Sequence, residues 1–198
     1  MVDGFIENQI AKWIKRYNKE DKNILEIGVG RRGKLIKYVK PDQHYIGFDL
    51  EISPYLPRKY AKRTNVHFFV GSATDIPLPD SSVDYIWATE VLEHIRGIDS
   101  AMNEIYRVCK SNAIILISIP NNYCYKYKKK GSHSDHVNNW SYQEFIKFIS
   151  PRFQVIEGTM KGWWIPIPIK KYSFQLSYSH PDEFYNTNFF FVLKCIKS

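Results

Sequence analysis

The chain has 198 residues, of which 44% are hydrophobic and 16% aromatic. These fractions exclude an intrinsically disordered chain, and the length suits one α/β domain with a sizeable core. No apolar run reaches the roughly 18 to 20 residues of a membrane span, and the first 20 residues lack the apolar core of a signal peptide. The formal net charge of +8 permits binding of anionic partners such as nucleic acid without requiring it.

The cysteines are few and widely separated. Cys109, Cys124 and Cys195 are odd in number, and their spacing does not match a metal-ligand pattern. We therefore expect free thiols in a reducing cytoplasm.

Local patterns predict alternating helices and strands. Apolar runs predict strands over 23–27, 44–49, 66–70, 83–89, 113–119, 153–160 and 188–196. Helical spacing or capping residues predict helices over 5–19, 34–39, 54–62, 99–109 and 141–149. Asp99 is the expected N-cap of the fourth helix, and Ser141 with Glu144 forms a capping box for the fifth. We expect an α/β fold: a three-layer Rossmann-like sheet of about seven strands, mostly parallel, with an antiparallel C-terminal edge strand.

The first predicted strand ends in a glycine-rich turn. Gly28, Gly30 and Gly33 would let a ligand approach the backbone, although this spacing also describes a dinucleotide-binding turn. Glu26 precedes the first glycine by two residues and would repel a pyrophosphate. A ligand with a cationic group, such as S-adenosylmethionine, is favoured there instead.

Acids follow two more of the predicted strands. Asp49 ends the second strand beside the glycine turn, where an acid can accept both hydroxyls of a ribose, and Leu50 belongs to the same predicted cofactor-binding set. Asp75 and Ile76 follow the third strand. An acceptor beside an apolar side chain suits an adenine ring.

Together these motifs, with the segment Asp84-Tyr-Ile-Trp-Ala-Thr-Glu-Val-Leu-Glu-His94 and Ser118-Ile-Pro-Asn121, resemble the class I S-adenosylmethionine-dependent methyltransferases. The likeness covers residues 22–150 and is greatest to the type 11 group. It implies that S-adenosylmethionine is the cofactor and S-adenosylhomocysteine the product. The chain departs from the family's G-x-G-x-G pattern because Arg32 stands where the third glycine is usual and Gly33 follows.

The resemblance also implies roles for individual residues. Gly28 and Gly30 would line the methionine moiety, and Glu26 would support its amino group. Asp49 would hold the ribose. Asp75 and Ile76 would flank the adenine, and Glu90 would lie near the methionine end and the substrate. Residues 1–198 are expected to form a single methyltransferase domain, with a leading helix over 1–20, a cofactor-binding core over 22–119, and a substrate-side loop with C-terminal strands over 120–198.

Three histidines are candidate general bases. Methyl transfer by in-line displacement needs positioning and a deprotonated acceptor, and histidine titrates near neutral pH. His136 is the first candidate, followed by His133 and His94; a role for each in holding a loop stays open. A zinc site from Cys124, His133, Asp135 and His136 matches no closed zinc module, so we expect no metal.

The predicted function is methyl transfer to the oxygen or nitrogen of a small-to-medium metabolite. RNA methylation is an alternative, because the run Tyr125-Lys-Tyr-Lys-Lys-Lys130 can contact bases and phosphate; a solvated lid loop is the simpler interpretation of that run. A non-catalytic S-adenosylmethionine-binding protein is a further alternative. Residues 162–169 are too rich in proline for a regular strand and are expected to cap the substrate pocket, contact another subunit or pack in the core. The sequence does not define the oligomeric state.

Overall fold

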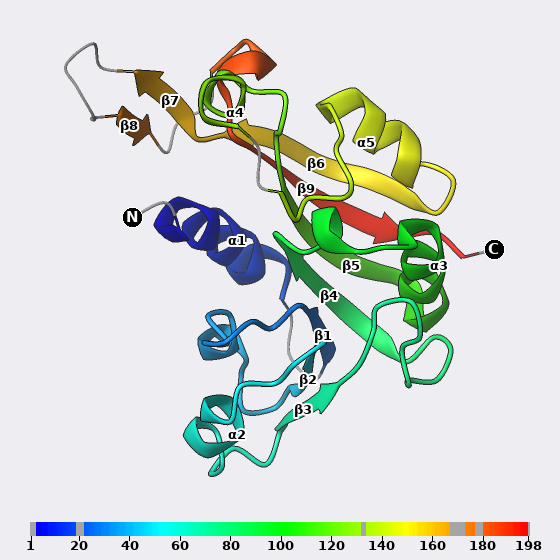
Figure 1. The fold of residues 1–198 in the computed structure, drawn as a ribbon. Coiled ribbons are helices and arrows are strands. Elements are labelled where there is room, and N and C mark those ends of the chain that lie inside the picture. The colour runs from blue at the N-terminus through cyan, green and yellow to red at the C-terminus, as the bar shows by residue number, and fades with distance from the viewer. Residues whose placement is uncertain (1–2, 19–21, 132–133, 167–172, 177–179, 198) are drawn as a thin grey trace.

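The computed structural model describes residues 3–18, 22–131, 134–166, 173–176 and 180–197. Its centre is a seven-stranded sheet in the order β3-β2-β1-β4-β5-β9-β6 (Figure 1). The strands are β1 (Asn23–Ile27), β2 (His44–Asp49), β3 (Val66–Val70), β4 (Val83–Thr89), β5 (Cys109–Pro120), β6 (Phe153–Lys161) and β9 (Asn188–Cys195). The first five strands pair in parallel, and β9 runs antiparallel to both β5 and β6. The predicted Rossmann-like sheet is confirmed, with β9 inserted beside β5 so that β6 forms the edge.

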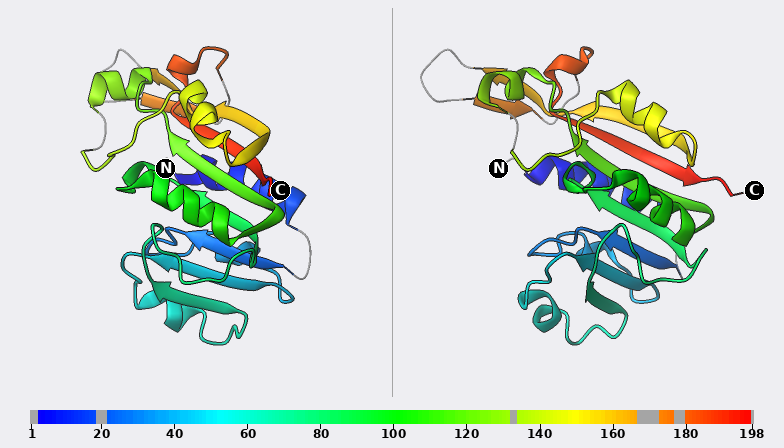
Figure 2. Two further views of the ribbon diagram at one scale, coloured as in Figure 1. Left: turned by 90° about the vertical axis from the view of Figure 1, so that its right-hand side faces the viewer. Right: turned by 45° about the vertical axis from the view of Figure 1, so that its right-hand side comes forward.

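Helices cover both faces of this sheet, as the views in Figures 1 and 2 show. One face packs against α1 (Asp3–Tyr17), the short 3-10 helix η1 (Ile36–Tyr38) and α2 (Tyr55–Lys59). The other face packs against α3 (Ile98–Val108) and α5 (Tyr142–Ile149). Each helix turns one apolar stripe toward the sheet, which gives the three layers expected from the sequence. No helix in the described ranges is long and apolar enough to cross a bilayer.

The leading helix is fixed to the far edge of the sheet. The indole of Trp13 donates a 2.9 Å hydrogen bond to Glu157 on β6, and the hydroxyl of Tyr17 donates a second one of 2.5 Å. The Trp13 ring also packs edge-on against Phe190 of β9. Polar and apolar contacts therefore hold α1 across the strands that close the C-terminal part of the sheet.

One predicted helix and the predicted N-cap of another are wrong. The segment 34–39 forms only the 3-10 turn η1, because Lys40 precedes Pro41 and that position disfavours helical backbone. Arg63 donates hydrogen bonds to the carbonyls of Ile36 and Val39, which a continued helix would have used. The fourth helix begins after Gly97, which is its N-cap in left-handed conformation, so Asp99 lies in the first turn instead.

Two segments expected to be irregular are ordered elements. Residues 125–130 form the short helix α4 (Tyr125–Lys130), which ends at Gly131 with a φ of 81° and contacts Phe184 through Tyr125. Residues 163–166 form β7 (Trp163–Pro166), which pairs antiparallel with β8 (Ser173–Leu176) and is therefore a regular strand despite its proline. Proline is tolerated there because a two-stranded ribbon has edges that need no donor. Residues 167–169 lie outside the described part of the chain.

Candidate active site

The strands β1, β2 and β4 end at the same edge of the sheet, and two adjoining cavities open there. One has a volume of about 810 Å³ and the other about 450 Å³, and Gly28, Gly30 and Glu90 line both. This edge is where open α/β sheets bind ligands, because the loops after the strands diverge and leave a crevice.

Bare backbone forms the wall between the two cavities. Gly28 has a φ of 73°, and a Cβ added to it would lie 2.6 Å from a methyl group of Val91. Gly30 has a φ of 61° with open space where its Cβ would project. Only glycine tolerates both conditions at Gly28, so the turn keeps its backbone accessible to a ligand.

Asp49 lies at the end of β2 and lines the larger cavity beside Leu50. One carboxylate oxygen accepts the amide of Gly30 at 2.9 Å, and the other accepts the amide of Leu50 at 2.8 Å. Each oxygen keeps acceptor capacity for one more donor. The carboxylate is thus held in one orientation and can accept a pair of hydroxyls.

Glu26 lines the smaller cavity and is 3% exposed. Burial raises its pKa to about 8; the 2.6 Å hydrogen bond from the hydroxyl of Tyr45 opposes that rise, and the charge of Asp49 adds to it. An acid kept neutral by burial becomes charged when a cation enters beside it, since an opposite charge favours the ionised form. Glu26 is therefore suited to an ammonium group.

Glu90 follows β4 and lies between the cavities with a φ of 50°, a conformation that is rare for residues other than glycine. Its carboxylate accepts the hydroxyl of Ser118 at 2.7 Å and the side-chain amide of Asn188 at 2.8 Å. The surroundings that hold this backbone position also aim the side chain at both cavities.

Another buried acid, Glu93, lies close enough to Glu90 to interact with its charge. Glu93 is in the 3-10 helix η2 (Leu92–His94) and is 2% exposed, and one of its oxygens has no hydrogen-bond partner in the described chain. Burial is the main cause that raises its pKa to about 9, and the charges of Glu90 and Asp135 add to the rise. Without a cation beside it, Glu93 is a neutral acid at neutral pH.

Two of the three predicted bases are brought together. The rings of His94 and His136 lie 4.8 Å apart, edge to face, and His94 lines the larger cavity. The segment that carries His136 is fixed to η2, since the amides of Val137 and Asn138 both donate to the carbonyl of Glu93. His133 lies outside the described residues.

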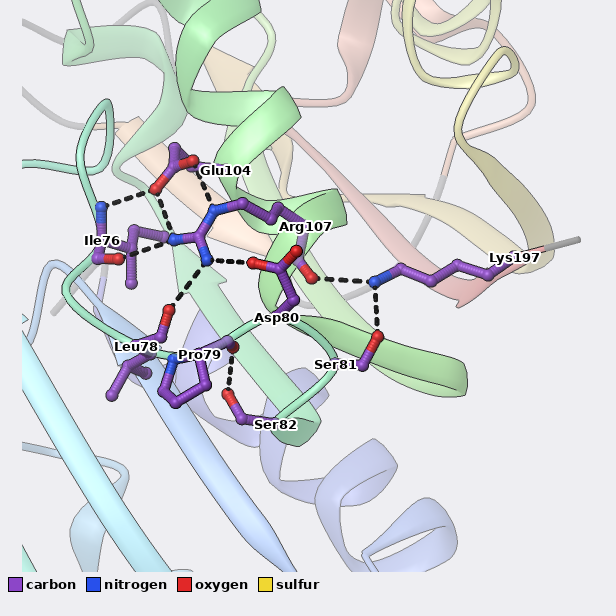
Figure 3. Close-up of polar contacts among 9 residues, drawn as sticks. All are labelled: Ile76, Leu78, Pro79, Asp80, Ser81, Ser82, Glu104, Arg107 and Lys197. Atoms are coloured by element: carbon purple, nitrogen blue, oxygen red, sulfur yellow. Dashed lines mark hydrogen bonds and ion pairs between the residues drawn. The ribbon is translucent and has the colours of Figure 1, made fainter.

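The lining of the larger cavity does not include the two residues predicted to contact adenine. Ser72 and Ala73 line the larger cavity, whereas Asp75 and Ile76 do not. Figure 3 shows how the loop that contains Ile76 and Leu78 is held in place. Arg107 of α3 donates hydrogen bonds to the carbonyls of both residues. The same guanidinium pairs with Glu104 and Asp80. Ile76 is thereby drawn into the core at 2% exposure.

Sequence reasoning missed several residues that shape the site. Glu93 lies in the segment from Asp84 to His94 that the sequence analysis singled out, but its burial beside Glu90 was not readable there. Tyr45 and Asn188 gave no local signal, and Ser118 was noted only as part of a family motif, because each of the three reaches its acid from a different strand. Tyr127 of α4 is also close to Glu90: burial is the main cause that raises its pKa, and the charge of Glu90 adds to it.

Comparison with known proteins connects this geometry to a family. The family model described as "Methyltransferase domain" matches residues 25–117. Those residues run from β1 into β5 and include Glu26, Asp49 and Glu90. Over these residues, a little under half of its length, the chain is similar to the methyltransferase domains of the class I S-adenosylmethionine-dependent enzymes. The predicted family is thus confirmed.

Individual methyltransferases show how far the likeness extends. Ajmaline N-methyltransferase from Rauvolfia serpentina is 29% identical over 105 residues, covering 50% of this chain and 36% of that protein. A ubiquinone/menaquinone biosynthesis C-methyltransferase from Rickettsia bellii is 28% identical over 168 residues, covering 77% of this chain and 62% of that protein. The chain therefore spans less than two thirds of the length of these curated relatives.

A solved structure has the same fold at low sequence identity. It is the 1,6-didemethyltoxoflavin-N1-methyltransferase of Burkholderia thailandensis with bound 1,6-didemethyltoxoflavin and S-adenosylhomocysteine. Its TM-score is 0.70 at 10% identity, and the match covers 99% of this chain and 80% of that one. The three methyltransferases differ in their acceptors, so the family likeness leaves the acceptor open.

Proposed function

We propose that this chain binds S-adenosylmethionine at the glycine turn and transfers its methyl group to the oxygen or nitrogen of a small-to-medium metabolite. The observation that carries the proposal is the arrangement of three acids around bare glycine backbone. Asp49 offers acceptors for a ribose, and Glu26 and Glu90 line the space beyond Gly28 and Gly30. A phosphate-bearing dinucleotide would meet these carboxylates unfavourably.

The residues present fit this cofactor. Its ammonium group and sulfonium sulfur are both positive, and buried Glu26 gains a counter-charge when an ammonium group binds. Ser72 and Ala73 are the cavity residues available to its adenine ring, with Leu50 exposed at the rim. When bound, S-adenosylmethionine supplies an activated methyl group, so the protein's task is to position the acceptor and take its proton.

The acceptor would enter through the open side of the larger cavity. His94, Asp135 and Val137 line this cavity together with Gly28 and Gly30. We place the general base of this reaction at His94 or His136, because imidazole is the usual proton acceptor in such sites. A cavity of about 810 Å³ lies within the range of small-molecule sites, which favours a metabolite over a macromolecule.

Calorimetry tests the cofactor step directly. S-adenosylmethionine and S-adenosylhomocysteine are titrated into the purified chain, with NAD as a comparison ligand. We expect dissociation constants in the micromolar range for both sulfur ligands and at least a tenfold weakening in Asp49→Ala. Asp42→Ala is the matched control, because Asp42 is an exposed acid that precedes the same strand at its other end. Failure of both sulfur ligands to bind would overturn the proposal.

A separate variant tests the adenine contact predicted from the sequence. Asp75 is exposed and lies outside the cavity lining. Asp75→Ala should leave S-adenosylhomocysteine affinity within about twofold of the wild type, whereas a tenfold loss would restore Asp75 to the site.

RNA methylation is the second candidate. Lys128, Lys129 and Lys130 are exposed at the end of α4, whose Tyr127 lies near Glu90. Electrostatic binding of RNA weakens steeply with salt. Salt-dependent retention of bulk RNA that is lost in a Lys128→Gln/Lys129→Gln/Lys130→Gln variant would favour this alternative over a metabolite acceptor.

A further inference from the structure

Three metal-binding side chains meet beside the larger cavity. Glu93 and His94 come from η2, and His136 comes from the segment before α5. One ligand atom from each lies within 4.8 Å of the others. Bonds of about 2.0 to 2.2 Å to a shared ion would place such atoms at most about 4 Å apart. Rotation of the exposed His94 ring and the half-buried His136 ring can close that difference.

Glu93 supplies an independent reason to expect a cation. One oxygen of its carboxyl is buried without a hydrogen-bond partner among the described residues, and the residue is 2% exposed. A buried polar atom without a partner loses its hydrogen bonds to water and gains none in return, so folded proteins rarely retain one without a ligand or water. A bound cation in the cluster would satisfy this oxygen.

Each of the two imidazoles has an oxygen atom beside its Nδ1, as metal-binding histidines usually do. Nδ1 of His94 lies 3.2 Å from the carbonyl oxygen of Asp135 and 3.3 Å from its carboxylate, and Nδ1 of His136 lies 3.0 Å from the side-chain oxygen of Asn122. An oxygen acceptor at Nδ1 places the proton there and leaves Nε2 with its lone pair. Nε2 of His94 is 3.8 Å from the Glu93 carboxylate. The tautomer needed for coordination is therefore set by neighbouring groups.

Hydrogen bonds of Asn138 join the two segments that carry the cluster. Asn138 donates from its side chain to the carbonyls of Leu92 and Ile95, at 3.0 and 2.7 Å, and from its backbone amide to Glu93. These bonds hold the segment with His136 against η2. The cluster is thus arranged by the fold before any ligand arrives.

We propose that Glu93, His94 and His136 bind a divalent transition-metal ion such as Zn²⁺ or Mn²⁺. Two imidazoles and one carboxylate are the donor set that such ions accept, and three protein ligands leave a position open. His94 lines the larger cavity, so the proposed ion would lie at the border of that cavity. This site departs from the sequence expectation that the protein binds no metal.

The ion would also define the acceptor, a step that rests on the proposed methyl transfer. An ion at this wall of the cavity would bind an acceptor through oxygen and make its hydroxyl more acidic. His94 and His136 would then act as ligands and not as general bases. The acceptor class becomes a hydroxyl-bearing small molecule able to reach both the ion and the glycine turn.

The test measures metal binding without the cofactor. Chelator-treated full-length protein is titrated with Zn²⁺ by calorimetry and with Mn²⁺ by electron paramagnetic resonance. We expect one ion per chain, and His136→Ala should weaken binding at least about tenfold. His67→Ala is the matched control, since His67 is exposed on β3 and outside the cluster, and it should bind as the wild type does.

A second variant distinguishes a loss of metal binding from a loss of the folded structure. Asn122→Ala leaves all three ligands in place and removes the oxygen that lies 3.0 Å from His136 Nδ1, together with the hydrogen bond that Asn122 donates to Asn139. We expect metal affinity to fall about tenfold with S-adenosylhomocysteine affinity unchanged. Absence of Zn²⁺ and Mn²⁺ binding, or unaltered binding in a His94→Ala/His136→Ala variant, would overturn the metal site. Loss of cofactor binding alone would overturn the proposed function and leave the metal site standing.

Discussion

Substitution of Glu26 by Gln should change how stability depends on pH. The buried carboxyl has a pKa of about 8, against 4.5 for an ordinary glutamate. The folded protein therefore binds a proton that the unfolded chain releases above pH 4.5. The stabilising contribution of this proton is complete below about pH 4.5 and is lost as the pH rises through about 8. Glutamine has a similar shape and does not ionise.

The magnitude follows from the pKa difference. At about 1.36 kcal/mol per unit, a rise from 4.5 to about 8 removes on the order of 3 kcal/mol of unfolding free energy between pH 5 and pH 8. The difference in unfolding free energy between Glu26→Gln and the wild type should shift by that amount in favour of the variant. Urea unfolding of the ligand-free proteins, followed by tryptophan fluorescence at several pH values, measures it. A difference that stays constant with pH would refute the reasoning.

A second variant examines the cause of the shift. The hydroxyl of Tyr45 donates to Glu26, and this bond lowers the pKa of the carboxyl. Tyr45→Phe removes the donor, so the pH at which the stability is lost should move upward. A downward movement would show that another group governs the titration.

Three further predictions concern the scaffold of the site. Arg107→Leu leaves the two carbonyls shown in Figure 3 without their donor; it should lower the unfolding free energy by about 2 kcal/mol, and a loss below about 0.5 kcal/mol would contradict this. Ser141→Ala removes the capping box of α5 and should cost about 1 kcal/mol in urea unfolding, whereas an unchanged midpoint would show that the cap is dispensable. Gly28→Ala places a Cβ 2.6 Å from Val91 and should weaken S-adenosylhomocysteine binding at least about tenfold in calorimetry. Gly4→Ala, with nothing within 4 Å of its added Cβ, is its control, and equal effects of the two glycine variants would refute the role of the turn.

Much of the fold was readable from local pattern. The ranges of β1, β2, β3 and β4 match the predicted strands, because short apolar runs between turn residues have few other conformations available. The capping box at Ser141 was equally local. Asp49 could be placed because an acid that ends the second strand of such a sheet lies beside the first glycine turn.

Other features depend on contacts between distant residues. The order β5-β9-β6 follows from which strand edges remain to be paired, which no single segment specifies. Glu26 was expected at a strand end, but its raised pKa comes from its burial in the folded sheet and from the charge of Asp49 at the end of the neighbouring strand. Asp75 was favoured by residue type, yet the hold of Arg107 on Ile76 keeps this part of the loop out of the cavity lining.

Local pattern specifies the strand and helix segments, the glycine turn and the acids at the strand ends, because periodicity and turn chemistry act over a few residues. The meeting of Glu93, His94 and His136 beside the cavity depends instead on the folded chain. The hydrogen bonds that bring His136 there run from Asn138 to η2, over a separation of more than 40 residues. Such a contact forms only when the whole sheet has placed both segments at the same edge, which local propensity does not encode.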